Sequence, residues 1–189
     1  MYISKRAKLN LLNVEDYFTV DLKQMKEYSK SNILLNKDAI VALLKAQKSL
    51  PPGYTFAVLS GYRSLEEQTK IVKLMEKELK VSHPNNYIEL LNKYTGGYEE
   101  LLLKTFSYNN HRSGYAVDLY ILKNNKEIDL GGQKMDERDN LNYYKNKKPL
   151  SNKEQTIKNN REILNNALSN NGFNNNPDEW WHWGYINVK

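Results

Sequence analysis

The chain has 189 residues, 40% of them hydrophobic and 11% aromatic, which is enough to bury the core of one ordinary domain. Its formal net charge of +6 comes from lysines spread over the whole length, so we interpret the excess as a solvated surface and exclude nucleic acid as the expected partner. Weak attraction to anionic polymers fits the charge equally well. The absence of cysteine excludes a disulfide framework and a thiolate metal site.

The N-terminal segment lacks the long apolar stretch and the small-residue cleavage site that are typical of a signal peptide. No run of residues approaches the length of a membrane span. If Met1 is the native start, we expect a cytoplasmic protein. If a leader has been removed, we expect a periplasmic or secreted one. The sequence does not indicate an oligomeric state.

In chain order, the first 30 or so residues alternate apolar and polar groups around residues 17–22, which favours an extended segment. From Asn36 apolar residues recur at helical spacing, and a Pro-Pro-Gly sequence ends this predicted helix. Residues 54–60 form a short apolar run that is typical of a buried strand. Ser64 and Glu67 then have the spacing of a capping box, which predicts the start of a second helix.

Residues 82–105 contain one proline and two glycines between amphipathic pieces, and we interpret them as a partly helical insertion whose role the sequence does not indicate. The clearest strand is 115–122, where every second residue from 117 to 121 is a large apolar one. Asp118 lies on the other face of this strand. We therefore expect it to point towards a cleft.

The chain is then predicted to turn back in a hairpin into residues 127–130. Ser151 and Glu154 form a second capping box, and Gly172 closes the helix that follows. A last strand is expected over residues 182–188.

Two segments carry the chemistry. His111 lies on a loop and Asp118 in the strand that follows it, while Glu179 and His182 lie three residues apart at a second boundary between a loop and a strand. Two histidines, one aspartate and a spare glutamate are the ligand inventory of a catalytic zinc site, in which a carboxylate activates a water in the fourth metal position. Gly114 is expected to allow a tight backbone path close to the metal, because it has no side chain.

Each of these residues also has a plain structural interpretation. An isolated histidine is more often a surface or packed residue than a ligand, and we keep that interpretation for His83. The three tryptophans around His182 are by themselves typical core aromatics. The joint occurrence of two histidines, each within a few residues of a carboxylate, favours the metal site.

The segment His-Arg-Ser-Gly-Tyr-Ala-Val-Asp at 111–118 and Glu-Trp-Trp-His at 179–182 resemble the His-x-x-Gly-x-Ala-x-Asp and Glu-x-Trp-His signatures of the zinc D-Ala-D-Ala metallopeptidases. This group is related in fold to lysostaphin-type peptidases and to hedgehog. Within it the chain most resembles the D-alanyl-D-alanine dipeptidases of the VanX type, over roughly residues 17–186. Further matching stretches are 18–22, 51–54, 60–63, 135–138, 159–173 and 179–183.

The resemblance implies that His111, Asp118 and His182 bind one zinc ion and that Glu179 is the catalytic base. Arg63 matches the family arginine that polarises the scissile carbonyl, and a fixed cation beside zinc does favour developing negative charge. Without the family, Arg63 is equally well a surface or capping residue.

Two further positions concern the substrate. Asp136 falls where the dipeptidases hold the free amino group of the substrate, and an exposed loop aspartate is the equal alternative. Asn109 stands where the family has a serine near the carboxylate of the substrate. Recognition of that carboxylate is therefore expected to differ.

We thus expect one α+β domain over residues 1–189, with helices around a central, mostly antiparallel sheet and one Zn²⁺ in its cleft. The predicted function is hydrolysis of the small peptide D-Ala-D-Ala to D-alanine by a Glu-activated, zinc-bound water. One alternative is a D,D- or L,D-carboxypeptidase that trims peptidoglycan stem peptides. The other is a zinc-stabilised binding module without turnover, which would need neither Glu179 nor Arg63.

Overall fold

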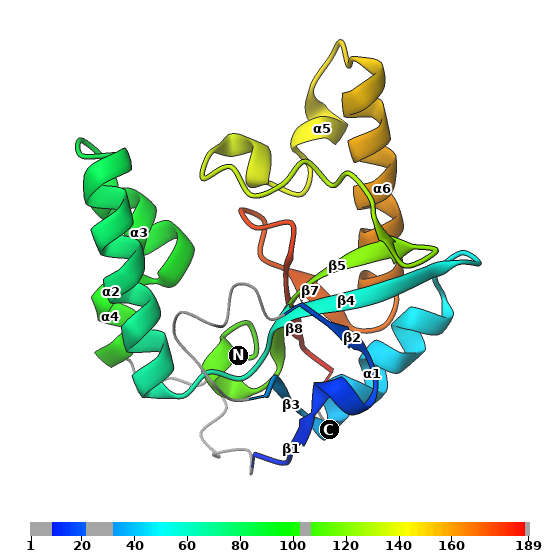
Figure 1. Cartoon of the computed structure of the whole chain (residues 1–189), viewed down its shortest axis with the longest axis horizontal. Coiled ribbons are helices and arrows are strands. Elements are labelled where there is room, and N and C mark those ends of the chain that lie inside the picture. Colours follow the sequence, from blue (N-terminus) through cyan, green and yellow to red (C-terminus); the bar gives the residue numbers. More distant parts are fainter. Residues whose placement is uncertain (1–8, 22–31, 103–106, 188–189) are drawn as a thin grey trace.

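The computed structural model describes residues 9–21, 32–102 and 107–187. At its centre is a six-stranded sheet in the order β2-β4-β5-β8-β7, with β6 paired to β5 (Figure 1). All strand pairs in this sheet are antiparallel except β2 with β4. The predicted α+β class with a mostly antiparallel sheet is therefore confirmed. The strands are β2 (Thr19–Val20), β4 (Tyr54–Ser60), β5 (Ala116–Lys123), β6 (Lys126–Glu127), β7 (Phe173–Asn175) and β8 (His182–Tyr185).

Two helices share the main hydrophobic core with the sheet. They are α1 (Lys37–Lys48) and α6 (Asn152–Ser169), and Leu43 of α1 and Leu164 of α6 are fully buried against β4 and β5. The Asn36 side chain caps α1 by accepting from the backbone N–H of Asp38, and both bonds of the predicted capping box at the start of α6 are present. Local signals in the sequence therefore set where both helices begin.

A small two-stranded sheet of β1 (Leu11–Asn13) and β3 (Leu34–Asn36) lies beside this core, with the short 3-10 helix η1 (Val14–Asp16) after β1. Gly114 packs against it. A Cβ atom on Gly114 would lie 2.9 Å from Cδ2 of Leu11, and Gly114 has a φ of +74°. The tight backbone path expected at this glycine is present, because its N–H donates to the carbonyl of His111, and the side chains of Leu11 and Leu9 lie closest to it. Its closeness to the metal stays a prediction.

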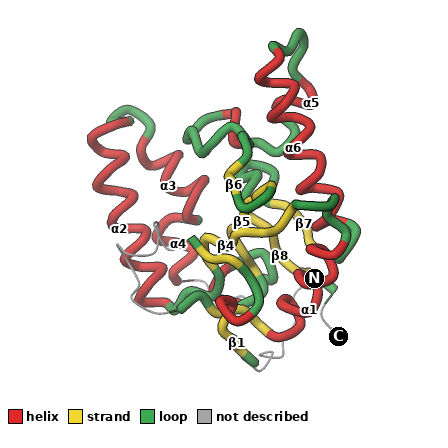
Figure 2. Tube along the Cα trace, turned by 45° about the vertical axis from the view of Figure 1, so that its right-hand side comes forward, coloured by secondary structure: helices red, strands yellow, loops and turns green. Residues whose placement is uncertain are grey.

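The helices α2 (Leu65–Ser82), α3 (Tyr87–Thr95) and α4 (Gly97–Leu102) form a lobe beside the sheet (Figures 1 and 2). We call residues 65–102 the α2–α4 lobe. Its interior is a second, smaller cluster in which Val72, Leu79, Leu90 and Leu91 are buried. The predicted capping box at Ser64 is present, and the predicted helical character of the insertion is confirmed by α3 and α4.

Several boundaries differ from the sequence-based expectations. Strand β7 was not predicted, because its Phe-Asn-Asn sequence is too short and polar to show a strand pattern, and it forms by pairing with β8. The hairpin strand β6 is only two residues long. The last strand ends at Tyr185, and residue 188 lies outside the described residues. The extended start of the chain is seen in β1 and β2, while residues 1–8 and 22–31 are likewise outside the described part.

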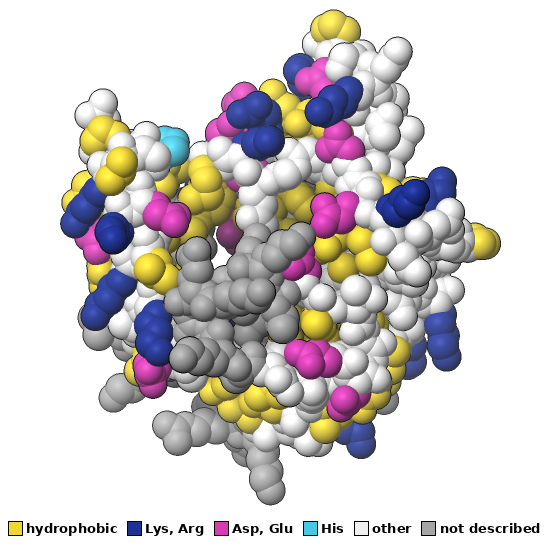
Figure 3. Space-filling view, viewed as in Figure 1, with side chains coloured by type: hydrophobic (Ala, Val, Ile, Leu, Met, Phe, Trp, Pro, Cys, Tyr) yellow, Lys and Arg dark blue, Asp and Glu magenta, His cyan; other side chains and the backbone are white. Residues whose placement is uncertain are grey.

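The remaining elements are the 3-10 helices η3 (His111–Ser113) and η4 (Glu137–Asp139) and the short helix α5 (Tyr143–Asn146). Within the described residues, no helix is long and apolar enough to cross a membrane. Lys and Arg side chains are spread over the visible face and do not gather in one patch (Figure 3). This distribution agrees with a solvated basic surface.

Candidate metal and peptidase site

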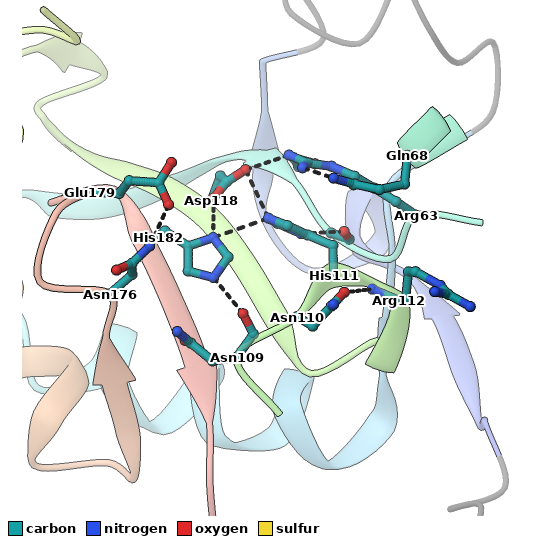
Figure 4. Close-up of polar contacts among 12 residues, drawn as sticks. Arg63, Gln68, Asn109, Asn110, His111, Arg112, Asp118, Asn176, Glu179 and His182 are labelled. Carbon is teal, nitrogen blue, oxygen red and sulfur yellow. Dashed lines mark hydrogen bonds and ion pairs between the residues drawn. The ribbon is translucent and has the colours of Figure 1, made fainter. Parts of the chain in front are cut away.

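The two sequence motifs meet at one point of the sheet (Figure 4). Asp118 of β5 pairs directly with His182 of β8 in the strand register, and His111 lies in η3, just before β5. Nε2 of His111 lies 3.1 Å from Oδ2 of Asp118, and Nδ1 of His182 lies 2.9 Å from Oδ1 of Asp118 and 3.1 Å from Nε2 of His111. All three side chains are buried. The structure therefore brings together the three residues predicted as metal ligands.

The outer nitrogen of each histidine ring faces a backbone carbonyl. Nδ1 of His111 is 2.6 Å from the carbonyl oxygen of Gly61, and Nε2 of His182 is 2.9 Å from that of Asn109. A carbonyl only accepts, so these nitrogens donate to it, and the other two nitrogens face Asp118, where each can bind a metal ion or a proton. Two imidazole lone pairs and a carboxylate that converge on one point fit a divalent cation such as Zn²⁺.

The electrostatics of the cluster agree with this donor set. Burial lowers the pKa of His111 to about 4, so its ring is neutral at physiological pH. Burial alone would raise the pKa of Asp118, but the histidines and Arg63 hold it well below its ordinary value. Burial alone would also lower the pKa of His182, yet the contact with Asp118 raises it. A metal ion and a proton therefore compete for Nδ1 of His182.

Arg63 lies on the other side of Asp118, between the end of β4 and the start of α2. Its Nη2 donates to Oδ2 of Asp118 over 2.7 Å, its Nε donates to Oγ of Ser60, and its Nη1 is 3.5 Å from Oε1 of Gln68. The guanidinium is thus a fixed cation in contact with one of the predicted metal ligands. Gln68 was not predicted as part of this site. The signal for it is a polar residue within the apolar stripe of α2, and its side chain is buried.

Glu179 is 8% exposed and lies in the tight turn before β8. The backbone N–H of Glu179 donates to the carbonyl of Asn176, and the carboxylate of Glu179 accepts from Nδ2 of Asn176 over 2.7 Å. Burial raises the pKa of Glu179 to about 7. A carboxylate with this pKa is suited to accept and return a proton near neutral pH. Asn176, three residues before Glu179, was not predicted as part of the site.

The three tryptophans and His83 have structural roles, as their plain interpretations predicted. Trp180, Trp181 and Trp183 are buried core residues, although Trp181 also lines the cavity in front of the site. His83 ends α2, and its Nδ1 contacts Oγ of the neighbouring Ser82, outside the cavity lining.

The two residues expected to bind substrate lie in different places. Asn109 lines the cavity, but its Oδ1 is buried without a hydrogen-bond partner, and this side chain packs against Gly184. Asp136 caps η4 and forms an ion pair with Arg138, which lowers the pKa of Asp136. The structure does not bring Asp136 into the cavity lining, although the neighbouring Met135 is there.

A cavity of about 550 Å³ opens in front of His111, Asp118 and His182. One wall is the α2–α4 lobe, which contributes residues from α2 and from the C-terminal turn of α3. The other walls are the motif loops and the segment before η4. Its lining includes Ile71, Leu74, Met75, Glu78, Asn92, Lys93, Tyr94, Thr95, Gly96, Gln133 and Met135 in addition to the residues of the site.

Comparisons with known proteins agree with this geometry. The family model described as D-ala-D-ala dipeptidase, peptidase M15, matches residues 15–188. The chain belongs to this family and is therefore a metallopeptidase. A search of curated proteins gives no match.

Among solved structures, the chain is similar to a point mutant of the vancomycin resistance D,D-pentapeptidase VanY from a VanB-type resistance cassette, crystallised in complex with Zn(II). That similarity has a TM-score of 0.51 and 15% sequence identity, over 100% of this chain and 88% of VanY. At this identity the likeness shows the fold alone.

Proposed function

We propose that this protein is a zinc-dependent peptidase that hydrolyses the bond between two D-alanine residues, with the free dipeptide D-Ala-D-Ala as its substrate. The observation that carries the proposal is the convergence of a buried His-Asp-His donor set, a buried glutamate and an arginine on one cavity, in a chain of the D-ala-D-ala dipeptidase family. A binding module would need the metal ligands but neither Glu179 nor Arg63.

His111, Asp118 and His182 are the residues that would hold the zinc ion. A bound Zn²⁺ supplies Lewis acidity, which makes a water molecule more acidic and polarises a carbonyl group. The VanY structure with Zn(II) supports this choice of metal. The carbonyls of Gly61 and Asn109 fix the two ring orientations, so the site needs little rearrangement to bind it.

The protein side of the reaction is proton transfer and charge stabilisation. The Glu179 carboxylate accepts a proton from the attacking water and returns it to the amine of the departing D-alanine. The hydrogen bond from Asn176 holds that carboxylate in place. Arg63 lies beside Asp118 and lines the cavity, so its positive charge favours the negative charge that develops on the carbonyl oxygen.

A D,D-carboxypeptidase acting on peptidoglycan stem peptides is the second candidate. The position of Asp136 favours it, because the carboxylate expected to hold a free amino group is engaged by Arg138 and lies outside the cavity lining. A peptidase that does not bind the free amino group of the substrate would accept a longer peptide on the N-terminal side of the scissile bond.

The two candidates are separated by the products formed from D-Ala-D-Ala, N-acetyl-D-Ala-D-Ala and a pentapeptide stem, identified by mass spectrometry. For a dipeptidase that reads the amine through Asp136, acetylation should lower kcat/KM at least roughly tenfold, since a charge-assisted hydrogen bond is lost. Asp136→Asn should then remove most of the difference. Equal cleavage of all three peptides would favour the carboxypeptidase, and cleavage of none by the zinc-loaded protein would refute both.

A further inference from the structure

The C-terminal carboxylate of D-Ala-D-Ala needs a partner when it enters the cavity, because a desolvated charge is costly unless it is paired. The family uses a serine near this group, and Asn109 stands in its place. The Asn109 side chain is neutral and packs against Gly184, while its backbone carbonyl is taken by His182. Asn109 therefore does not balance a negative charge.

Two lysine or arginine side chains line the cavity among the described residues, Arg63 and Lys93. Arg63 forms a 2.7 Å ion pair with Asp118 and also contacts Ser60 and Gln68. Arg112, next to a metal ligand in sequence, points away from the site (Figure 4). Lys93 is the cation that remains.

Lys93 belongs to the last turn of α3, which lies on the sheet side of α2 (Figure 2). Its Nζ is 3.6 Å from Oδ1 of Asp178, the residue directly before Glu179, and 5.3 Å from the ring centre of Tyr94. The Lys93 side chain is 28% exposed and that of Asp178 is 52% exposed. A contact of this length and exposure is weak, so a substrate carboxylate can replace Asp178 at little cost.

We propose that Lys93 is a specificity-determining residue that pairs with the C-terminal carboxylate of the substrate, and that Asp178 pairs with this lysine when no substrate is bound. This inference rests on the proposed peptidase function and holds for a dipeptide and for a stem peptide, since both end in the same carboxylate. It also gives the insertion a role, because the insertion supplies this lysine to the wall of the cavity.

The test compares D-Ala-D-Ala with its C-terminal amide. Binding is measured by calorimetry to the zinc-loaded Glu179→Gln variant, in which substrate is not turned over, and kcat/KM is measured with the zinc-loaded wild-type chain. The acid should bind about 10- to 100-fold more tightly than the amide, the scale of one charge-assisted hydrogen bond. Lys93→Gln should remove this preference without weakening the binding of the amide, and Lys93→Arg should keep most of it.

Asp178→Asn should tighten binding of the acid by about twofold to fivefold, the scale of an exposed ion pair, and leave the amide unchanged. Lys80 provides a matched control in the same lobe, because it pairs with Glu76 over 2.8 Å and lies 5.3 Å from the ring centre of Tyr87, away from the cavity lining. Lys80→Gln should not change the binding of the acid or of the amide.

The assignment would be overturned if the Glu179→Gln variant bound the acid and the amide equally well. It would also be overturned if adding Lys93→Gln weakened the binding of both ligands by the same factor. If the acid binds selectively through Lys93 but the wild-type chain hydrolyses nothing, the assignment stands and the proposed peptidase function fails.

Discussion

The substitution Glu179→Gln should have opposite effects on catalysis and on stability. Burial raises the pKa of Glu179, which suits it to proton transfer, but burial also makes its ionised form destabilise the fold. The amide cannot accept the proton of the attacking water, so kcat should fall at least ~10²-fold with zinc content unchanged. Glutamine can still accept the hydrogen bond from Asn176 through its side-chain oxygen. The fold should therefore be retained.

The effect on stability follows from the pKa of Glu179, which burial raises from 4.5 to about 7 in the folded protein. A raised carboxyl pKa means that the folded state binds a proton more tightly than the unfolded state, so ionisation destabilises the fold as the pH rises from about 4.5 to 7. The shift corresponds to a free energy of unfolding that is about 3 kcal/mol lower above pH 7. This destabilisation disappears below about pH 4.5, where the carboxyl group is protonated in both the folded and the unfolded state.

The assay is thermal unfolding of the chelator-treated wild-type and Glu179→Gln chains at pH 4 and at pH 8. The variant should unfold at a temperature roughly 6 to 12 °C higher at pH 8, with little difference at pH 4. Near-normal turnover by the zinc-loaded variant would refute the role of Glu179 as the base. A Tm difference that does not depend on pH would refute the link between burial and ionisation.

The other predictions concern the metal, the arginine and the turn before β5. His182→Ala should lose most of its zinc, measured by atomic absorption, and full occupancy would remove His182 from the site. Arg63→Lys should lower kcat/KM about tenfold or more, because an ammonium cannot reproduce the planar fork that contacts Asp118, and an unchanged value would leave Arg63 a structural role. Gly114→Ala should destabilise the fold by at least about 1 kcal/mol in denaturant unfolding, since a φ of +74° and the approach of Leu11 both oppose a Cβ atom; an unchanged midpoint would contradict this.

The helices and long strands could be predicted because their signals are local. Ser64 and Ser151 each have a glutamate three residues on, and both capping boxes form as expected. The metal cluster could also be predicted, since His111 and Asp118 lie close in sequence and Glu179 and His182 form a second short motif. What joins the two motifs is the pairing of β5 with β8, which places Asp118 opposite His182.

The walls of the cavity could not be predicted, because they depend on contacts between distant segments. Lys93 carries no motif, and its relevance follows only from the position of α3 beside the turn that contains Asp178. Asp136 illustrates the opposite case. Its sequence position matches the family, but Arg138 two residues later competes for the same carboxylate. The structure leaves its role in binding the substrate amine a prediction.

The α2–α4 lobe has a small hydrophobic cluster of its own, and Tyr94 packs against both this cluster and the main core. The buried leucines of this cluster pack within the lobe, whereas the predicted metal ligands lie on β5, on β8 and on η3 just before β5. Hydrogen exchange should therefore show the lobe amides opening at a lower free energy than those of β4 and β5. Under the proposed function, substitutions in α3 should change which peptides bind while the predicted metal ligands stay in place. Gln68 of α2 contacts Arg63, so α2 is the part of the lobe where specificity and chemistry stay linked.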